Sequence, residues 1–191
     1  KFETSFPADF IVEAIDQTRG WFYSLTAVNI ALFGKSPFKN LICTGFINAA
    51  DGEKISKKLK NYTDPMELMD KVSSDAFRFT FITSPVVVGE NINLDDKDVV
   101  NVERKLTMLY NVLDFFLMYA AVDGWSTDDK KPDFFNPLDK WILSKLQRLI
   151  QEVTGYMDSY DLMRASRPVY EFLDGLSNWY IRRSRKRFWK S

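Results

Sequence analysis

The hydrophobic positions in the first ninety residues predict a strand, a helix and a second strand, in that order. Residues 8–15 combine β-branched and aromatic side chains after a proline, which is typical of a short buried strand. From Gln17 to Phe33 apolar residues recur every three or four positions, and Gly34 ends this helical pattern. The run at 41–47 again indicates a strand. This order predicts a parallel βαβ unit in an α/β fold, with functional groups at the carboxyl ends of the strands.

The second half of the chain has the pattern of helices alone. Apolar side chains step by three and four from Val99 to Ala120, and again after an acidic loop at 123–136. A third helix is predicted from Asp161 to Phe188, where Pro168 should kink or restart it. Long amphipathic helices of this kind pack in bundles. The predicted organisation is therefore an α/β domain at 1–90 followed by an all-α helical bundle at 91–191.

The composition narrows the classes of function. Lys plus Arg and Asp plus Glu number 26 each, so a nucleic-acid site must come from local charge. One cysteine and no histidine exclude an internal disulfide and the Ser–His and Cys–His pairs, and we expect no metal site. The longest apolar run, 115–122, is less than half of what a bilayer requires, and no signal-peptide pattern begins the chain. We therefore expect a soluble, cytoplasmic protein that does not contact a membrane.

A lysine-rich loop follows the second predicted strand. Lys54 and Lys57 lie on either side of Ser56, and ammonium groups placed in this way can stabilise the charge that develops as a polyphosphate leaves. Lysine runs are more often a solvated surface, and charge alone favours that simpler interpretation.

A second group of candidates lies where the first strand ends and the helix begins. There Asp16 can accept hydrogen bonds from ribose hydroxyls, and the Gln17 amide can align a carbonyl. Trp21, one turn later, could line an apolar pocket. A helix cap and a core tryptophan explain the same residues about equally well.

The C-terminal segment combines basic and aromatic residues. Six basic and four aromatic residues stand between Asn178 and Lys190, and no acidic residue follows Asp174. This composition suits RNA phosphates and unstacked bases. Helical spacing predicts one face that contacts phosphates, formed by Arg182, Arg185 and Lys186. It predicts another face that packs on the bundle, formed by Trp179, Tyr180 and Arg183. The alternative is a solvated basic face beside a purely structural aromatic core.

In combination these segments resemble a class I aminoacyl-tRNA synthetase, and within that class the isoleucyl branch. Residues 54–58, Lys-Ile-Ser-Lys-Lys, are similar to the KMSKS loop, and residues 16–22 are similar to the Gly-Trp-Phe stretch of the adenylate pocket. Further matching segments follow in the family's order: Asn61-Tyr62, Asp64-Pro65, Asp75-Ala76-Phe77-Arg78, Ser84-Pro85-Val86 and Asn178-Trp179-Tyr180. The resemblance implies the second half of a Rossmann-type nucleotide-binding fold, followed by helices of an anticodon-binding domain.

The resemblance also implies an activity: activation of isoleucine by ATP, with Mg²⁺ as its counter-ion, and transfer of the isoleucyl group to tRNA(Ile). It implies catalytic roles at the departing pyrophosphate for Lys54 and Lys57. ATP or adenylate contacts are implied for Glu13, Asp16, Gln17, Ser56 and Lys57, with Asp16 on the ribose. Trp21 would form a wall of the isoleucine pocket. Contacts with tRNA are implied for Arg182, Arg183, Arg185 and Lys186.

The chain departs from the family's pattern at several points. Ala14 stands where glycine is usual, and Lys58 occupies the fifth position of the loop. A chain without histidine cannot supply a HIGH-type motif, and the editing insertion is missing. We therefore interpret the chain as a fragment that is inactive alone, with the N-terminal half of the catalytic domain and the editing domain as its missing partners. The alternative is a free-standing helical RNA-binding or assembly module with a structural α/β part.

Overall fold

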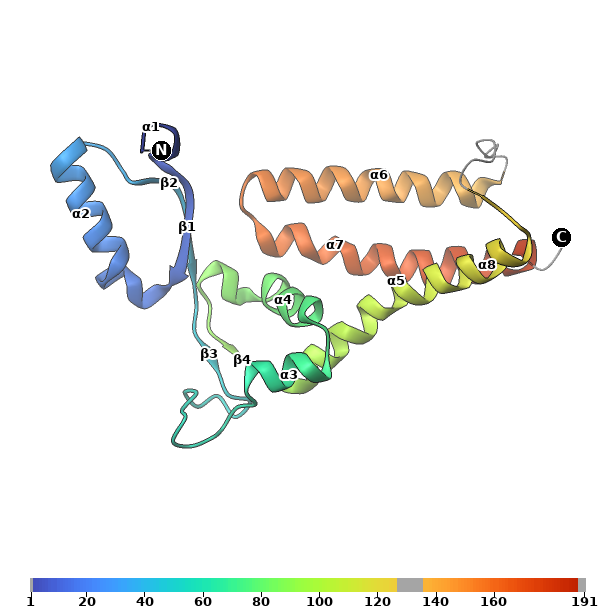
Figure 1. Cartoon of the computed structure of the whole chain (residues 1–191), viewed down its shortest axis with the longest axis horizontal. Helices are drawn as coiled ribbons and strands as arrows, with labels where there is room; N and C mark the ends of the chain where they lie inside the picture. The colour runs from blue at the N-terminus through green and yellow to red at the C-terminus, as the bar shows by residue number, and fades with distance from the viewer. Residues whose placement is uncertain (1, 127–135, 189–191) are drawn as a thin grey trace. The chain divides into compact units, whose positions relative to one another are not determined.

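Two parallel strands organise the N-terminal part of the chain. β1 (Ala8–Ala14) pairs in parallel with β2 (Phe38–Thr44), so that Ala14 at the end of β1 lies opposite Thr44 at the end of β2. The 3-10 helix η1 (Ile15–Arg19) and helix α2 (Trp21–Phe33) connect them (Figure 1). This is the predicted βαβ unit, and the predicted α/β fold class is confirmed.

The start of the connecting helix differs from the prediction. The pattern predicted one helix from Gln17, whereas α2 begins at Trp21 and a 3-10 turn precedes it. Gly20 separates the two with a backbone conformation outside the helical region. The Gln17 side chain accepts a hydrogen bond from the Trp21 N–H at 3.0 Å, which satisfies one of the free donors at the start of α2. Hydrophobic spacing does not record such a local change in hydrogen bonding.

A second parallel pair extends the strand region beyond Thr44. β3 (Ile47–Asn48) pairs with β4 (Ile92–Asn93), and the Gly45 N–H donates to the Val86 carbonyl at 2.9 Å. A Cβ atom at Gly45 would come within 2.0 Å of the Glu90 carbonyl oxygen. Only glycine allows the backbone to approach so closely here.

The chain divides into two compact units. The first comprises Lys1–Leu68 with Phe81–Asp96, and the second comprises Met69–Thr80 with Lys97–Ser191. The structure describes residues 2–126 and 136–188, as a computed structural model. Most of the acidic loop predicted at 123–136 and the last residues of the basic segment therefore lie outside the described residues. Four short helices also lie within residues 2–90. They are α1 (Phe2–Ser5), α3 (Pro65–Lys71), α4 (Ser74–Thr83) and the 3-10 helix η2 (Pro85–Val88).

The second unit is built from the predicted helices. They are α5 (Asp96–Val122), α6 (Pro137–Asp158), α7 (Leu162–Asp174), the π-helix η3 (Gly175–Ile181) and α8 (Arg182–Phe188). Asn136 caps α6 by accepting from the Leu138 N–H at 2.9 Å, and Asp161 caps α7 by accepting from the Arg164 N–H at 3.1 Å. α6 and α7 run side by side as a hairpin (Figure 1).

The third predicted helix changes its character at Gly175 rather than at Pro168. α7 continues through Pro168, and the hydrogen bonding changes to the π pattern only over Gly175–Ile181. A π-helix has more residues in each turn than an α-helix, so it rotates every later side chain to a new direction. Faces that were predicted across residues 179–187 with α-helical spacing are therefore displaced.

One described helix, α5, is long and apolar enough to cross a membrane by length and composition. The core helix of a soluble protein can meet the same criterion. Val99 and Val102 on its first turns are buried, whereas no residue of the apolar stretch that meets this criterion is buried. A single helix of this kind is weak evidence for a membrane span.

Candidate functional site

The lysine loop is held by hydrogen bonds across its base. Asn48 and Lys54 form an isolated antiparallel bridge. On the other side, the Asn61 side chain accepts from the Ser56 N–H at 3.0 Å and donates to the Lys54 carbonyl at 3.2 Å. Asn61 therefore fixes the backbone on both sides of Ile55. Sequence reasoning missed this role, although Asn61 stands in one of the segments that carry the resemblance.

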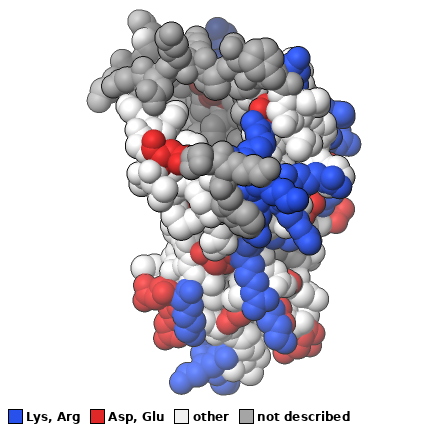
Figure 2. Space-filling model, turned by 90° about the vertical axis from the view of Figure 1, so that its right-hand side faces the viewer, with Lys and Arg blue, Asp and Glu red and all other residues white. Residues whose placement is uncertain are grey.

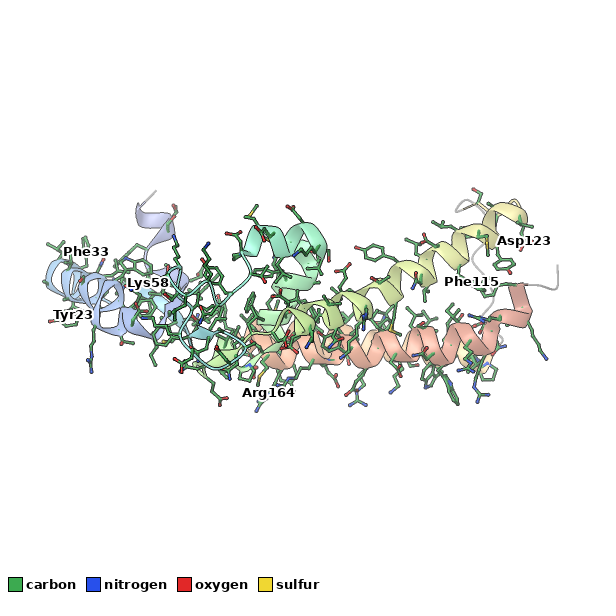
Figure 3. The ribbon with its side chains drawn as sticks, turned by 90° about the horizontal axis from the view of Figure 1, so that it is seen from below. Tyr23, Phe33, Lys58, Phe115, Asp123 and Arg164 are labelled. Atoms are coloured by element: carbon green, nitrogen blue, oxygen red, sulfur yellow. The ribbon has the colours of Figure 1, made fainter. Side chains whose placement is uncertain are left out.

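The lysine side chains of this loop remain accessible. Lys54, Lys57 and Lys58 are exposed, and none of them pairs with a carboxylate among the residues that the structure describes; Figure 3 labels Lys58. Lys54 and Ile55 also line a pocket of about 270 Å³ together with Phe46, Ile47 and Asn48. The loop therefore presents cations beside an apolar pocket at the end of β3, which is an arrangement that can receive an anionic ligand.

The strand-end candidates follow β1 in the short helix η1. The Gln17 amide donates to the Asp16 carboxylate at 3.2 Å, while its oxygen accepts from the Trp21 N–H. Glu13 and Asp16 are exposed. Trp21 is 45% exposed, whereas its neighbour Phe22 is only 5% exposed and supplies the packing contact of this turn. Trp21 is therefore not the core tryptophan of the alternative interpretation.

The two groups of candidates follow the carboxyl ends of strands in two different sheets. Because β1 and β2 are parallel, Ala14 and Thr44 bring the carboxyl ends of the two strands together. Asp16 and Gln17 come directly after the first of these ends, and the lysine loop follows β3 beyond the second. Within the described residues no hydrogen bond or ion pair joins the two groups directly, so a shared ligand would have to bridge them.

The basic C-terminal segment is divided differently from the prediction. Trp179 is 46% exposed, and the guanidinium carbon of Arg183 lies 3.8 Å from the centre of its ring. The expectation that Trp179 and Arg183 pack on the bundle is therefore wrong, because the π-helix turns them outwards. Arg185 instead lies over the Phe115 ring at 5.9 Å. Arg182 and Lys186 are exposed. Figure 2 shows Lys and Arg side chains gathered on part of the face that is turned to the viewer.

A buried carboxylate anchors the other side of the same segment. Asp139, 8% exposed at the start of α6, accepts two hydrogen bonds from the Arg187 guanidinium at 2.6 and 2.8 Å and one from the Tyr180 hydroxyl at 2.9 Å. The bonds from Arg187 hold the pKa of Asp139 below its ordinary value, and burial raises the pKa of Tyr180. Arg187 is thus engaged within the protein, in contrast to Arg182 and Lys186.

Comparison with family models matches two parts of the chain. Residues 1–95 match tRNA synthetases class I (I, L, M and V), and residues 139–191 match the anticodon-binding domain of tRNA ligase. Among solved structures, a Mycobacterium tuberculosis methionyl-tRNA synthetase in complex with methionyl-adenylate shares the fold with a TM-score of 0.77, at 22% identity over 96% of this chain and 36% of that one. A leucyl-tRNA synthetase from Agrobacterium radiobacter, in a ternary complex with tRNA and LeuAMS, shares the fold with a TM-score of 0.73. Its sequence is 23% identical, over 95% of this chain and 23% of that one.

The chain therefore belongs to the class I tRNA synthetases, and its residues 139–191 match their anticodon-binding domain. Within that class its similarity is to the isoleucine–tRNA ligases. The ligase of Treponema denticola is 44% identical over 100% of this chain, and that of Protochlamydia amoebophila is 46% identical over 98%. The chain spans 18% of the length of each of these relatives. The family predicted from the sequence is confirmed.

Proposed function

We propose that this chain is a segment of an isoleucine–tRNA ligase, which activates isoleucine with ATP and transfers it to tRNA(Ile) in the cytoplasm. Identity of 44% to 46% across nearly all of the chain supports the amino-acid specificity. The lysine loop is the observation that supports this proposal, because Asn61 fixes its backbone while Lys54 and Lys57 have no carboxylate partner among the described residues. We assign residues 1–90 to the catalytic domain and 91–191 to the anticodon-binding helices.

The proposed chemistry uses the two groups at the strand ends. Lys54 and Lys57 would offset the negative charge that grows on the pyrophosphate as isoleucine displaces it from ATP. The exposed carboxylate of Asp16 would accept from the ribose, and Glu13, Gln17 and Ser56 would complete the adenylate contacts. Trp21, exposed at the start of α2, would form a wall of the isoleucine pocket. Mg²⁺ would arrive with ATP; the described residues hold no cluster of three or more His, Cys, Asp or Glu side chains that could bind it.

The direct test is ATP–pyrophosphate exchange by the full-length ligase. Exchange should require isoleucine and should be much weaker with leucine. The 191-residue chain alone should be inactive, since it covers only one part of the relatives' length. Exchange that does not depend on isoleucine would contradict the proposed function.

The clamp by Asn61 gives a second prediction. Asn61→Ala removes both hydrogen bonds to the loop and should slow adenylate formation about tenfold, because the lysines are then less well oriented. The KM for isoleucine should change less than twofold, since Asn61 contacts the loop and not the amino-acid pocket. Asn61→Asp, which keeps the acceptor for the Ser56 N–H, should be intermediate. Faster tryptic cleavage within residues 57–60 would report the loosened loop, whereas wild-type kinetics in Asn61→Ala would rule out a positioning role.

The exposed basic residues give a third prediction. Arg182→Ala combined with Lys186→Ala should weaken tRNA(Ile) binding and reduce the dependence of log K on log salt by about one unit for each charge removed. Filter binding at several salt concentrations measures both quantities, and adenylate formation should be unaffected. Arg148→Ala is the matched control, because the Arg148 guanidinium is also exposed in the helical unit but pairs with Glu152 at 2.7 Å. If the slope of log K against log salt is the same in the wild type, the double variant and Arg148→Ala, the basic segment is a solvated face that does not contact tRNA.

A further inference from the structure

Trp179 differs from the other aromatic residues at the C-terminal end of the helical unit. Phe115, Tyr119 and Phe188 contact one another with ring centres 5.0 to 5.8 Å apart, and Tyr180 is hydrogen-bonded to Asp139. Trp179 is 46% exposed even with the Arg183 guanidinium over its ring. Phe115, Tyr119 and Phe188 are partly buried in these ring contacts, whereas much of the Trp179 indole surface remains accessible.

The outward direction of Trp179 is imposed by the fold. Tyr180, the next residue, is drawn inwards by its hydrogen bond to Asp139 at 2.9 Å, and consecutive residues of a helix point in different directions. On the other side, Asn178 is held by its amide, which donates to the Asp174 carboxylate at 2.7 Å. The indole is thus oriented before any ligand binds, which lowers the conformational cost of binding.

The surroundings of the indole indicate the chemistry of its ligand. Arg182 and Lys186 are exposed one helical turn apart, and no carboxylate follows Asp174 in the sequence. An aromatic ring beside exposed cations suits single-stranded nucleic acid, because the base stacks on the ring while the phosphates contact the cations. An indole stacked with a guanidinium adds a second flat, cationic surface for a base.

We propose that Trp179 and Arg183 form a stacking site for an unpaired nucleobase of the tRNA whose phosphates contact Arg182 and Lys186. This inference rests on the proposed function, which supplies the RNA. It assigns to Trp179 a role in binding that is separate from the electrostatic contacts, and the two roles have different salt dependences.

The test compares Trp179→Ala with Trp179→Phe in the full-length ligase, using a tRNA(Ile) transcript. Trp179→Ala should raise the Kd about 5- to 150-fold, the range of base–aromatic stacking. Trp179→Phe should stay within about threefold, because phenylalanine can still stack. The slope of log K against log salt should match that of the wild type in both variants, since no phosphate contact is lost. Isoleucine-dependent pyrophosphate exchange should be unchanged, which shows that the variants are folded and that the proposed function holds.

Fluorescence provides a measurement that does not depend on the alanine variant. Stacking on a base should quench the Trp179 emission when tRNA is added, and Trp179→Phe should lack that part of the quenching. Equal quenching in both proteins, or wild-type affinity in Trp179→Ala, would overturn the stacking site. If the stacking site is overturned but Arg182→Ala with Lys186→Ala still weakens tRNA binding, the cations contact the RNA without a stacked base on Trp179. Loss of isoleucine dependence would instead contradict the proposed function itself.

Discussion

Replacing Lys57 by alanine in the full-length ligase should slow isoleucyl-adenylate formation about thirty- to a thousand-fold, with little change in the affinity for isoleucine. The exposed Lys57 ammonium has no carboxylate partner among the described residues, so it is free to meet a ligand. The pyrophosphate acquires its additional charge only as it leaves, and a cation that meets this charge stabilises the transition state selectively. Removing one such contact costs about 2 to 4 kcal/mol.

ATP–pyrophosphate exchange together with single-turnover kinetics measures this effect. A lower rate constant at an unchanged isoleucine affinity is the expected result, because the lost interaction exists only in the transition state. Lys58→Ala is the matched control: it removes an equal charge from the same exposed loop and should cost less than about tenfold, as an unspecific electrostatic effect. Unchanged pyrophosphate exchange in Lys57→Ala would show that this loop does not take part in adenylate formation.

Replacing Asp139 by alanine should release the C-terminal helix α8 from α6. The change removes both hydrogen bonds from Arg187 and the one from Tyr180, and it leaves a guanidinium without its partner. Breaking a fully buried ion pair costs about 3 to 5 kcal/mol. Because the Arg187 side chain is 46% exposed, water replaces part of the interaction, and we expect about 2 kcal/mol here.

Hydrogen exchange followed by mass spectrometry measures this local stability in the full-length protein. Amides of η3 and α8 should exchange about thirtyfold faster in Asp139→Ala, whereas those of the first unit should be unchanged. Asp158→Ala is the matched control, because this exposed aspartate lies at the other end of α6 and, among the described residues, forms no ion pair with α8. Unchanged protection of α8 in Asp139→Ala would show that packing alone holds the helix.

The carboxylate of Asp139 should also make the local stability of α8 depend on pH. The folded-state pKa of Asp139 is lowered from the ordinary value of 3.8, first by the hydrogen bonds from Arg187. A group whose pKa is lowered by folding contributes stability that is present above the unfolded pKa and is lost as the pH falls through the folded pKa. Protection of α8 should therefore be constant between about pH 5 and 7 and decrease below about pH 4. Asp139→Asn should abolish this dependence.

Local patterns in the sequence determined the order of the elements and the family. The spacing of apolar residues predicted the βαβ unit and the long helices, because this spacing follows directly from the geometry of each element. The lysine loop and the stretch around Trp21 predicted the family, since their chemistry is carried by short contiguous segments. These signals, together with further segments in the family's order, predicted the fold class and the family, and the structure and the family models confirmed both.

The tertiary structure decided the directions of side chains and the contacts between distant segments. Asp139 and Arg187 are 48 positions apart, and no periodicity in either segment indicates that they pair. Asn61 clamps the lysine loop through backbone atoms, which carry no signature in the sequence. The π-helix at Gly175–Ile181 turned Trp179 outwards, contrary to the prediction from α-helical spacing. In each case the stabilising contacts join groups that come together only when the chain folds. The local spacing of residues does not determine such contacts.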